Sequence, residues 1–535
     1  MKTINTEYAT PVGRQRNLRD LLELKVQQHR EDPFIIFVDK DDNEEIVTYG
    51  QFDEQVNRLG YWLIGQGIEK GDFVLVHLPN STGFLVALHA CTKIGAVMIP
   101  SIIFDVADDM EYKINFSKAK LIITDGNYHP MFKSILPKCP TVQEILIYRS
   151  EEKIPDTCSW EEALSGPSAE LPEVAIDPLD MAQMMFTSGT TARPKGVMLT
   201  HANFLYIGEV IARSFAVTPE DRYLLVLPLF HVNAQCISYF ACLTAGASIV
   251  VCEQFSARRF SPILRQYDCT ICSLVAATLR MILAAPEHPL DSENNLWRCP
   301  YAIAITDDEW DAFEKRFGTT LLDLYGLTET LAPCTIMPIW GEHRRGSVGW
   351  PNFGLEIRAV DESRNDLPVD VVGEIAVKGQ PGYSIFKGYY NNPEATAKDL
   401  DEDGWFYTGD YGRVDKDGYV YFIDRKKDVI QRGGENIAAA EVERVLSEHP
   451  GIEEAVVMAV PDEIRDEAVM AIIRPKSGKE LSGDEIKDFC RARMAKFKVP
   501  EHIKITEEDF PKTSIGKLRK NIIRADVLKD WETTR

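Results

Sequence analysis

The chain has 535 residues, of which 45% are hydrophobic and 26% charged, and these ordinary globular values exclude a wholly disordered or collagen-like protein. Its length suggests about three or four domains or subdomains. The 59 Lys and Arg residues against 82 Asp and Glu residues give a net charge of −23, which argues against a general nucleic-acid binder but allows a small anionic ligand held by a few local donors.

The N-terminal segment MKTINTEYATPVGRQRN has no apolar core, so it lacks the pattern of a secretory signal. No run of about 18 apolar residues occurs in the chain, and the sequence therefore predicts no membrane-spanning helix. The last residues, Glu-Thr-Thr-Arg, match no lipidation or targeting signal. These features predict a soluble cytoplasmic protein.

Residues 1–70 are predicted to form helical segments, with apolar residues near helical spacing in LRDLLELKVQQHRED and in YGQFDEQVNRLGYWLIGQGI. Four short apolar runs then predict strands, and a longer stretch predicts a helix at 84–95. The predicted strands are 73–78, 96–100, 121–125 and 144–148. Because these strands show little polar alternation, they indicate a parallel sheet covered on both faces.

The same pattern returns in the middle of the chain, with strands predicted at 223–230, 247–253 and 269–275 between helical stretches. We infer a large N-terminal region built from two related α/β layers. The last of these strands contains one CxxC pair, Cys269 and Cys272, among 11 scattered cysteines. Residues three apart on a strand point to opposite faces, so the pair favours reduced structural thiols over a redox or metal site.

From about residue 345 the pattern changes to short β-rich runs separated by turn residues. LEIRAVDESRNDLPVDVVGEIAVKG predicts one hairpin, and residues 419–434 predict another with a basic turn. Helices and strands then alternate to the C-terminus. The predicted fold class is α/β, with α/β layers over about 1–344, a small β-barrel-like subdomain over about 345–424, and a small mobile α+β domain over 425–535.

The strongest local signal is the loop from Phe186 to Gly196, FTSGTTARPKG, which follows an apolar run and precedes a segment that becomes helical from about residue 201. Its hydroxyl and backbone N–H groups can donate to a polyphosphate, and Lys195 adds a positive charge. The loop is not a P-loop, because its lysine precedes the glycine instead of following it. A solvated Ser/Thr turn is the alternative interpretation.

Further motifs follow TSGTTARPKG in a fixed order. With these motifs, the chain resembles the adenylate-forming superfamily, which contains acyl-CoA synthetases, peptide-synthetase adenylation domains and luciferases. The phrases FTSGTTARPKGV, TAGASIV and IFKGYYNNPEATAK, with the RGGEN loop, are similar to bacterial carnitine and crotonobetaine CoA ligases. The resemblance implies that 1–424 form an adenylation domain and 425–535 a lid domain. The further motifs are PLFHV (228–232), YGLTET (325–330), GWFYTGD (404–410), DRKKDVIQRGGENI (424–437) and PKTSIGK (511–517).

The resemblance implies an ATP site. Tyr325 would stack on adenine, and Asp323 would accept a hydrogen bond from its amino group. Glu329, with Thr187, would hold Mg²⁺, which shields the charge of a departing pyrophosphate. Without the motif, Glu329 would be interpreted as a charge at a helix N-terminus. The phosphate contacts would come from Thr187, Ser188, Gly189, Thr190, Thr191, Lys195 and Thr328.

Asp410 and Arg425 are implied to hold the ribose hydroxyls, since a carboxylate accepts from both hydroxyls and a guanidinium donates to them. A turn residue after Gly409 is the alternative for Asp410, and a solvated hairpin charge is the alternative for Arg425. For the neighbouring Lys426, a solvated charge is the preferred interpretation.

Lys517, in PKTSIGK, is implied to be the catalytic lysine. A cation between the attacking carboxylate and the α-phosphate would stabilise the transition state, so the small domain must close for adenylation. A basic surface face is the alternative, because other basic residues crowd the same stretch. They are Lys512, Arg519, Lys520 and Arg524.

The RGGEN loop implies a second use of the small domain. Gly433, Gly434 and Glu435 would face the site after this domain rotates and CoA arrives, with Lys427 at the hinge. A tight turn formed by the two glycines alone is the alternative.

His231, in PLFHV, is implied to lie beside the acid and the thiol, where amino-acid-activating relatives carry an Asp. It therefore argues against an α-amino acid substrate, and a core histidine is the alternative. The stretch from Tyr301 to Asp307 lacks the glycines of many relatives, which predicts a narrower or differently shaped acyl pocket. Asp307 is a candidate counter-charge for a cationic acid, although an N-cap of the following helix is preferred.

The sequence therefore predicts an ATP-dependent acid–CoA ligase that forms an acyl-adenylate and then a CoA thioester, with ATP, Mg²⁺ and CoA as cofactors. Carnitine or crotonobetaine is the first expected acid, and a medium-chain or aryl acid is the second. Two further hypotheses are a carrier-loading adenylation enzyme acting in trans and a nucleotide-binding regulator without catalysis. Monomer and homodimer both remain open.

Overall fold

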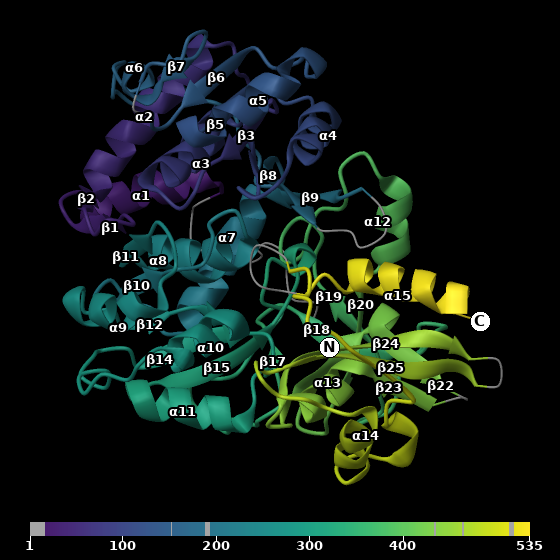
Figure 1. Cartoon of the computed structure of the whole chain (residues 1–535). Coiled ribbons are helices and arrows are strands. Elements are labelled where there is room, and N and C mark those ends of the chain that lie inside the picture. Colours follow the sequence, from purple (N-terminus) through teal and green to yellow (C-terminus); the bar gives the residue numbers. More distant parts are fainter. Residues whose placement is uncertain are drawn as a thin grey trace, which may run out of the picture. The chain divides into compact units, whose positions relative to one another are not determined.

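The computed structural model describes residues 16–150, 152–187, 193–432, 435–462, 465–512 and 518–534 (Figure 1). These residues divide into two compact units. Unit 1 holds the described residues of Met1–Gly189, Arg193–Glu356 and Lys378–Trp405, and unit 2 holds those of Ile357–Val377 and Phe406–Arg535. The domain boundary predicted at residue 425 stays a prediction.

The first sheet of unit 1 is mostly parallel, and its order is β7-β6-β5-β3-β4-β8-β9. The pairs from β7 to β8 are parallel, and β9 returns antiparallel to β8. β3, β4 and β5 are buried along their whole length, as expected for apolar runs covered on both faces. The strands are β3 (Phe73–His77), β4 (Val97–Pro100), β5 (Leu121–Thr124), β6 (Glu144–Ile147), β7 (Cys158–Ser159), β8 (Met181–Thr187) and β9 (Lys195–Thr200).

Helices pack against this sheet (Figure 1). Met110 and Ile114 of α4 and Phe132 of α5 share one apolar core with Leu75 and Ile99 of the sheet. α3 is buried over its whole length and packs against α1 and α2. The helices are α1 (Leu18–His29), α2 (Tyr49–Gly65), α3 (Thr82–Ile94), α4 (Ala107–Ser117), α5 (His129–Ile135) and α6 (Trp160–Ala163).

The second sheet of unit 1 has the order β17-β16-β15-β14-β12-β10-β11-β1-β2, with β13 paired to β14. Its middle pairs are parallel, whereas β16 and β17 at one edge and β2 at the other run antiparallel to their neighbours. The three predicted strands of this layer are confirmed by β10, β11 and β12–β13. The strands are β1 (Pro33–Val38), β2 (Glu44–Thr48), β10 (Arg222–Leu225), β11 (Ser248–Cys252), β12 (Ile271–Cys272), β13 (Leu274–Val275), β14 (Arg298–Ala302), β15 (Thr320–Tyr325), β16 (Thr335–Ile336) and β17 (Trp350–Pro351).

The prediction that residues 1–70 are helical segments is wrong for β1 and β2. β1 pairs in parallel with β11, and Ile35 lies opposite Ile249, more than 200 residues later in the chain. Local residue spacing carries no signal for so distant a partner. The helices of this half are α7 (His201–Ser214), α8 (Phe240–Ala245), α9 (Ala257–Gln266), α10 (Ala276–Ala284) and α11 (Asp307–Phe317).

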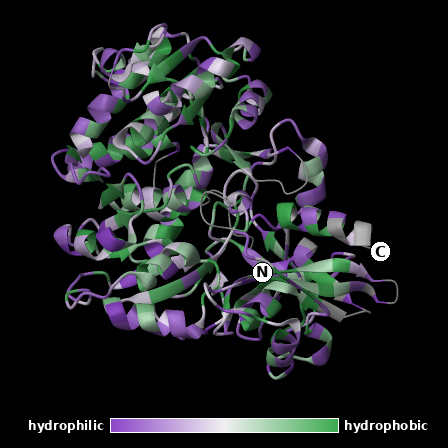
Figure 2. Cartoon of the chain, viewed as in Figure 1, coloured by the Kyte–Doolittle hydropathy of each residue, from purple (hydrophilic) through white to green (hydrophobic). Residues whose placement is uncertain are grey.

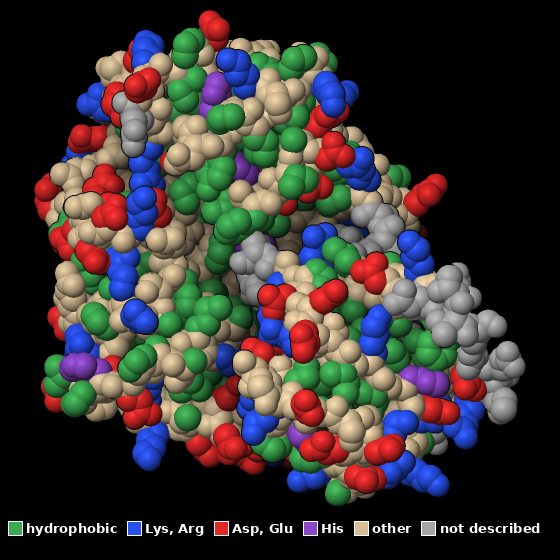
Figure 3. All heavy atoms as spheres, in the orientation of Figure 1, with side chains coloured by type: hydrophobic (Ala, Val, Ile, Leu, Met, Phe, Trp, Pro, Cys, Tyr) green, Lys and Arg blue, Asp and Glu red, His purple; other side chains and the backbone are tan. Residues whose placement is uncertain are grey.

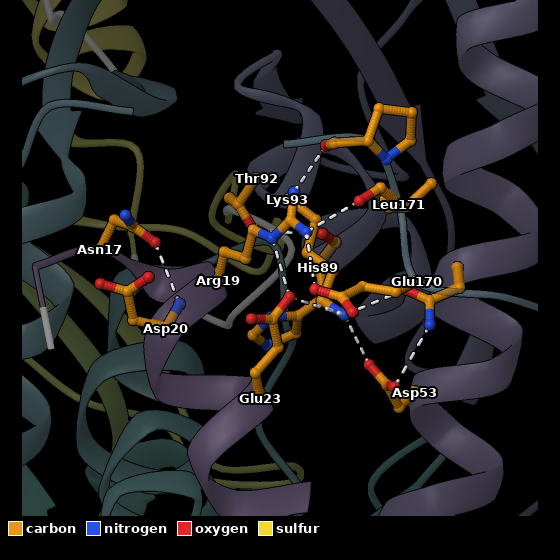
Figure 4. Close-up of polar contacts among 12 residues, drawn as sticks. Asn17, Arg19, Asp20, Glu23, Asp53, His89, Thr92, Lys93, Glu170 and Leu171 are labelled. Atoms are coloured by element: carbon orange, nitrogen blue, oxygen red, sulfur yellow. Dashed lines mark hydrogen bonds and ion pairs between the residues drawn. The ribbon is translucent and has the colours of Figure 1, made fainter. Parts of the chain in front are cut away.

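A buried network of charges joins the first three helices (Figure 4). The Lys93 side chain on α3 is 1% exposed, and its Nζ lies 2.6 Å from Asp53 Oδ1 on α2 and 3.6 Å from Glu23 Oε1 on α1. Arg19 on α1 binds Glu23 and donates to the carbonyl of Leu171. Because a buried ammonium needs such partners, the network fixes these helices relative to one another.

Unit 2 contains two sheets, ordered β18-β19-β20-β21 and β23-β22-β25-β24, with β26 beside β25. Alternate residues of β24 and β25 form two apolar cores, one with α13 and α14 and the other with α15. The elements of these two sheets and their helices are β18 (Glu356–Val360), β19 (Gly373–Lys378), β20 (Trp405–Val414), β21 (Val420–Arg425), β22 (Val429–Arg432), β23 (Glu435–Ala438), α13 (Ala439–Ser447), β24 (Ile452–Asp462), β25 (Asp466–Pro475), α14 (Gly483–Arg491), β26 (His502–Ile505) and α15 (Lys520–Thr534). One further helix, α12 (Pro393–Asp399), belongs to unit 1.

The prediction that residues 419–434 form a hairpin is wrong. β21 pairs with β20, whereas β22 pairs with β23, where Ile430 lies opposite Ile437. The short 3-10 helix η6 (Lys426–Asp428) separates the two strands, and each joins a different sheet. The predicted fold class is confirmed: the chain is a mixed α/β protein with a large N-terminal and a small C-terminal part.

Hydropathy follows the burial of the elements. Figure 2 shows the strands of unit 1 mostly in hydrophobic colours, whereas hydrophilic residues gather on the outer helices. Figure 3 shows acidic side chains interspersed with basic ones over the visible face. Within the described ranges, no helix has both the length and the apolar character needed to cross a membrane.

Candidate active site

The predicted phosphate loop connects two antiparallel strands of unit 1. β8 ends at Thr187 and β9 begins at Lys195, and these two residues lie opposite each other in the pairing register. The strand pair therefore places both residues at the mouth of the loop. The other predicted loop residues lie outside the described residues, namely Ser188, Gly189, Thr190 and Thr191.

Glu329 lies in the short 3-10 helix η5 (Thr328–Thr330), just beyond the carboxyl end of β15. Its side chain is buried, and the Tyr389 hydroxyl donates to its Oε1 at 3.0 Å. Burial raises the pKa of the Glu329 carboxyl, and the Lys195 ammonium opposes that shift. Burial thus leaves the charge of this carboxylate poorly compensated despite Lys195, and a divalent cation bound there would compensate it further.

Lys195 is held near Glu329 by two residues that the sequence analysis did not assign. Its Nζ lies 2.8 Å from Asp399 Oδ2 on α12 and 3.8 Å from the centroid of the Tyr389 ring. The Tyr389 hydroxyl also lies 3.2 Å from that Asp399 oxygen. The phrase IFKGYYNNPEATAK contains Tyr389, and Asp399 follows it closely, but the resemblance gave neither residue a role.

Asp323 lies on β15, buried at 6% exposure, two residues before Tyr325 at the end of the same strand. Tyr301, opposite it on the parallel strand β14, donates its hydroxyl hydrogen to Asp323 Oδ2 at 3.0 Å. Burial raises the pKa of the Asp323 carboxyl to about 7. Thr328 and Glu329 follow shortly after Tyr325. The structure thus places four predicted nucleotide-binding residues at the carboxyl end of β15, which is the edge where open parallel sheets bind ligands.

Replacing Asp323 by asparagine is expected to remove a pH-dependent loss of stability. Its carboxyl titrates near pH 7 when folded and about pH 4 when unfolded, so the folded chain binds this proton more tightly. The resulting stabilisation is fully present below about pH 4 and is lost as the pH rises to about 7, a change of about 4 kcal/mol. Urea unfolding should therefore show Asp323→Asn gaining stability over the wild type across this window.

The control for this experiment is Asp308→Asn, at an exposed position of α11. Its free energy of unfolding should follow the wild type to within about 0.5 kcal/mol at every pH. A constant difference between Asp323→Asn and the wild type from about pH 4 to about pH 7 would contradict a raised pKa at Asp323.

The predicted ribose pair lies within unit 2. Asp410 on β20 and Arg425 on β21 are opposite each other in the antiparallel register, with Arg425 Nε 3.9 Å from Asp410 Oδ1. The prediction for Lys426 is wrong, because it is not a solvated charge. Its Nζ lies 2.8 Å from Glu362 Oε2 and 3.2 Å from Glu374 Oε2, so it is held in an ion-pair network.

His231 is half-buried, and its ring packs edge-on against Phe230 with 4.8 Å between the ring centroids. It comes shortly before η4 (Asn233–Tyr239), a π-helix, and such turns occur often at functional sites. The Nε2 atom of the ring is itself buried, and the role of His231 beside the acid stays a prediction.

The stretch without glycine contains a strained residue. Ile303 has a left-handed backbone (φ 75°), which a β-branched residue rarely adopts, and its side chain is 41% exposed. The prediction that Asp307 is the N-cap of α11 is wrong. Thr306 is the N-cap, and its side chain accepts from the N–H of Glu309 in a capping box, so Asp307 is the first helical residue.

Several predicted residues of the small domain lie outside the described residues, namely Gly433, Gly434 and Lys517. The side chains of Lys427 and Glu435 are not described either. The backbone of Lys427 lies in η6, and Glu435 begins β23.

Within the described part of the chain, no three or more His, Cys, Asp or Glu residues gather in a way that could hold a metal ion. Cys269 and Cys272 are buried free thiols whose pKa values are raised by burial. Mg²⁺ bound with a nucleotide needs only one or two carboxylates besides phosphate oxygens, so Glu329 fits such a site.

Comparison with known proteins matches residues 22–390 to the AMP-binding enzyme family and residues 441–517 to the C-terminal domain of AMP-binding enzymes. The chain belongs to the AMP-binding enzyme family. The predicted enzyme class is confirmed, since the chain is an AMP-forming acyl-CoA synthetase. Acyl-CoA ligases of this family use ATP and CoA.

Individual relatives agree with this assignment. The crotonobetaine/carnitine–CoA ligase of Citrobacter koseri is 35% identical over 513 residues, which cover 95% of this chain and 99% of that protein. ATP-bound MatB from Rhodopseudomonas palustris is 26% identical with a TM-score of 0.85, covering 95% and 99% of the two chains. The o-succinylbenzoate CoA synthetase of Bacillus subtilis, with its acyl-adenylate intermediate, is 25% identical with a TM-score of 0.82, covering 95% and 98%.

Proposed function

We propose that this family member is an acid–CoA ligase for a small carboxylic acid, with carnitine or crotonobetaine as the first candidates. The observation that carries the proposal is the similarity to the crotonobetaine/carnitine–CoA ligase of Citrobacter koseri, which extends over nearly the whole of both chains. His231 supports it as well, because no carboxylate stands at that position to hold the ammonium of an α-amino acid.

The proposed reaction has two half-reactions. In the first, a carboxylate oxygen of the acid attacks the α-phosphorus of ATP, the bond from this phosphorus to the bridging oxygen breaks, and pyrophosphate leaves. In the second, the sulfur of CoA attacks the acyl carbon of the adenylate, AMP leaves with the bonding electrons, and the thiol proton passes to solvent. Making AMP the leaving group replaces one difficult substitution by two easier ones.

The residues of the chain bind and orient the nucleotide in this scheme. Thr187 and Lys195 contact phosphate oxygens, the lysine as a compact positive charge. Asp323 accepts a hydrogen bond from the adenine amino group. In unit 2, the facing pair of Asp410 and Arg425 holds the ribose hydroxyls, a role supported by their cross-strand pairing.

We assign the metal site to Glu329, with the Thr187 hydroxyl as a second ligand. The buried carboxylate fits Mg²⁺, because this ion prefers oxygen ligands and would compensate the buried negative charge. When bound, Mg²⁺ neutralises charge on the leaving pyrophosphate.

The remaining roles rest on the resemblance. Lys517 stabilises the transition state of adenylation, Gly433, Gly434 and Glu435 contact CoA, and Lys427 acts as the hinge. A cytoplasmic location is also proposed, and the free cysteines, which are mostly buried, are consistent with a reducing compartment.

Pyrophosphate release by the full-length protein with ATP and Mg²⁺ tests the proposed function. The acids are carnitine, crotonobetaine, butyrate, octanoate, benzoate and alanine, each with and without CoA. We expect release with carnitine or crotonobetaine at least about tenfold faster than with the other acids, since a pocket built to bind a polar group rejects analogues that lack it. CoA should increase the rate, because it removes the adenylate.

Other outcomes would change the proposal in defined ways. Pyrophosphate release with octanoate or benzoate, but with neither carnitine nor crotonobetaine, would overturn the choice of acid. If benzoate is the acid that supports release, an aryl acid–CoA ligase is favoured, in line with the similarity to the Bacillus subtilis synthetase. Release with alanine would contradict the interpretation of His231. Acylation of an added phosphopantetheine carrier without turnover of free CoA would favour a carrier-loading enzyme.

A further inference from the structure

The buried hydroxyl of Tyr389 lies between two carboxylates and has no role in the scheme above. It lies 3.0 Å from Glu329 Oε1 and 3.2 Å from Asp399 Oδ2, and the residue is 3% exposed. A phenol has one hydrogen to donate, and a bond to Oε1 engages one of the two oxygens of Glu329. The hydroxyl therefore orients the Glu329 carboxylate without using all of its capacity for ligands.

The ring of Tyr389 contacts a second site residue. The Nζ of Lys195 lies over the ring face, 3.8 Å from the centroid, and 2.8 Å from Asp399 Oδ2. An ammonium on a flexible four-carbon stem loses much of its freedom when a ring face and a carboxylate hold it together. Tyr389 and Asp399 thus set where the charge of Lys195 lies relative to Glu329.

The backbone around Tyr389 is tied to the same two parts of the site. The N–H of Tyr390 donates to the carbonyl of Gly196, next to Lys195 on β9, at 2.8 Å. The N–H of Phe386 donates to the carbonyl of Glu329, also at 2.8 Å. The segment between these bonds has little freedom, so the position of the Tyr389 ring is well defined.

We propose that Tyr389, together with Asp399, is a positioning residue that holds Lys195 and the Glu329 carboxylate in the arrangement that binds the triphosphate of ATP and its Mg²⁺. This inference rests on the proposed function, because it takes Glu329 as the metal ligand and Lys195 as a phosphate contact. Tyr389 acts through these two residues. Groups that orient metal-binding side chains typically contribute about 10- to 100-fold to metal affinity or activity.

Calorimetric titration of the full-length protein with Mg·ATP, without any acid, tests the proposal. Tyr389→Phe removes the hydroxyl and keeps the ring beneath Lys195. We expect the Mg²⁺ concentration for half-maximal ATP binding to rise about 10- to 100-fold, and excess Mg²⁺ to restore binding. Asp399→Asn, which removes the ion pair with Lys195, should weaken ATP binding about tenfold even at saturating Mg²⁺.

Tyr390→Phe is the matched control, because it removes the hydroxyl of the adjacent residue, whose ring packs against Phe73 and Phe116. Its Mg²⁺ requirement should stay within about twofold of the wild type. An unchanged Mg²⁺ requirement in Tyr389→Phe would overturn the proposal. An equal loss of binding at every Mg²⁺ concentration, with a lower thermal midpoint, would also overturn it, since it indicates a purely structural role.

The titration separates this inference from the proposed function. Because the titration contains no acid, its result for Tyr389 does not depend on which acid is the substrate. Failure of the proposed function would show differently, as intact Mg·ATP binding without pyrophosphate release for any acid of the panel.

Discussion

Glu329→Gln is expected to lower the rate of pyrophosphate release by about 100- to 1,000-fold, because it removes the charge that holds the metal ion at the leaving group. Glutamine has nearly the shape of glutamate, and its Oε1 can still accept the hydrogen bond from Tyr389. The fold around η5 should therefore be preserved. The loss should exceed that of Tyr389→Phe, because a ligand contributes more than the group that orients it.

The rate is measured as pyrophosphate release at fixed ATP over a series of Mg²⁺ concentrations, and excess Mg²⁺ should not restore the Glu329→Gln variant. Glu31→Gln is the control, since this side chain is 90% exposed, and it should keep the wild-type rate within about twofold. A Glu329→Gln variant with the wild-type rate and Mg²⁺ dependence would contradict the assignment of the metal site to Glu329.

The strands of unit 1 that could be predicted are β3 to β6 and β10 to β13, because a strand buried on both faces appears as a continuous apolar run. β3, β4 and β5 are of this kind, and each is buried along its whole length. β1 is equally apolar, but its position in the sheet depends on two partners. One is β11, far along the chain, and the other is its antiparallel neighbour β2, which has three exposed residues. Spacing within a short window cannot reveal such a partner.

The pairing of β21 and β22 shows a related limit. Both runs have β character and a basic turn lies between them, which is the local pattern of a hairpin. Each strand finds a better partner elsewhere, β21 in β20 and β22 in β23, so tertiary pairing decides the outcome. Local signals predict that a strand exists more reliably than which strand it joins.

The candidate site shows the same distinction. Tyr325 and Glu329 could be predicted together, because both belong to the YGLTET motif, and Asp323 precedes that motif by two residues. The resemblance to the adenylate-forming superfamily gave all three their roles. Tyr389 and Asp399 could not be assigned, because their role depends on contacts with distant residues. The bond from Lys195 to Asp399, for example, joins residues 204 positions apart.

Lys517→Ala is expected to slow formation of the acyl-adenylate by about 100- to 1,000-fold while leaving the second half-reaction nearly intact. The lysine charge is needed where the carboxylate of the acid approaches the triphosphate, because two anions must meet there. No such pair of anions reacts when CoA attacks the adenylate. Single-turnover assays should therefore show slow adenylate formation from ATP, but thioester formation from a supplied acyl-adenylate within about threefold of the wild type.

Lys512→Ala distinguishes this role from that of a general basic face in the same stretch. Lys512 forms an ion pair with Glu454, and Lys520 forms one with Glu443, so both have partners within unit 2. Their charges are accounted for by the fold, and Lys512→Ala should change both half-reactions less than about threefold. If Lys512→Ala and Lys517→Ala slow adenylate formation equally, the stretch contributes a diffuse positive field, and Lys517 is not the catalytic lysine.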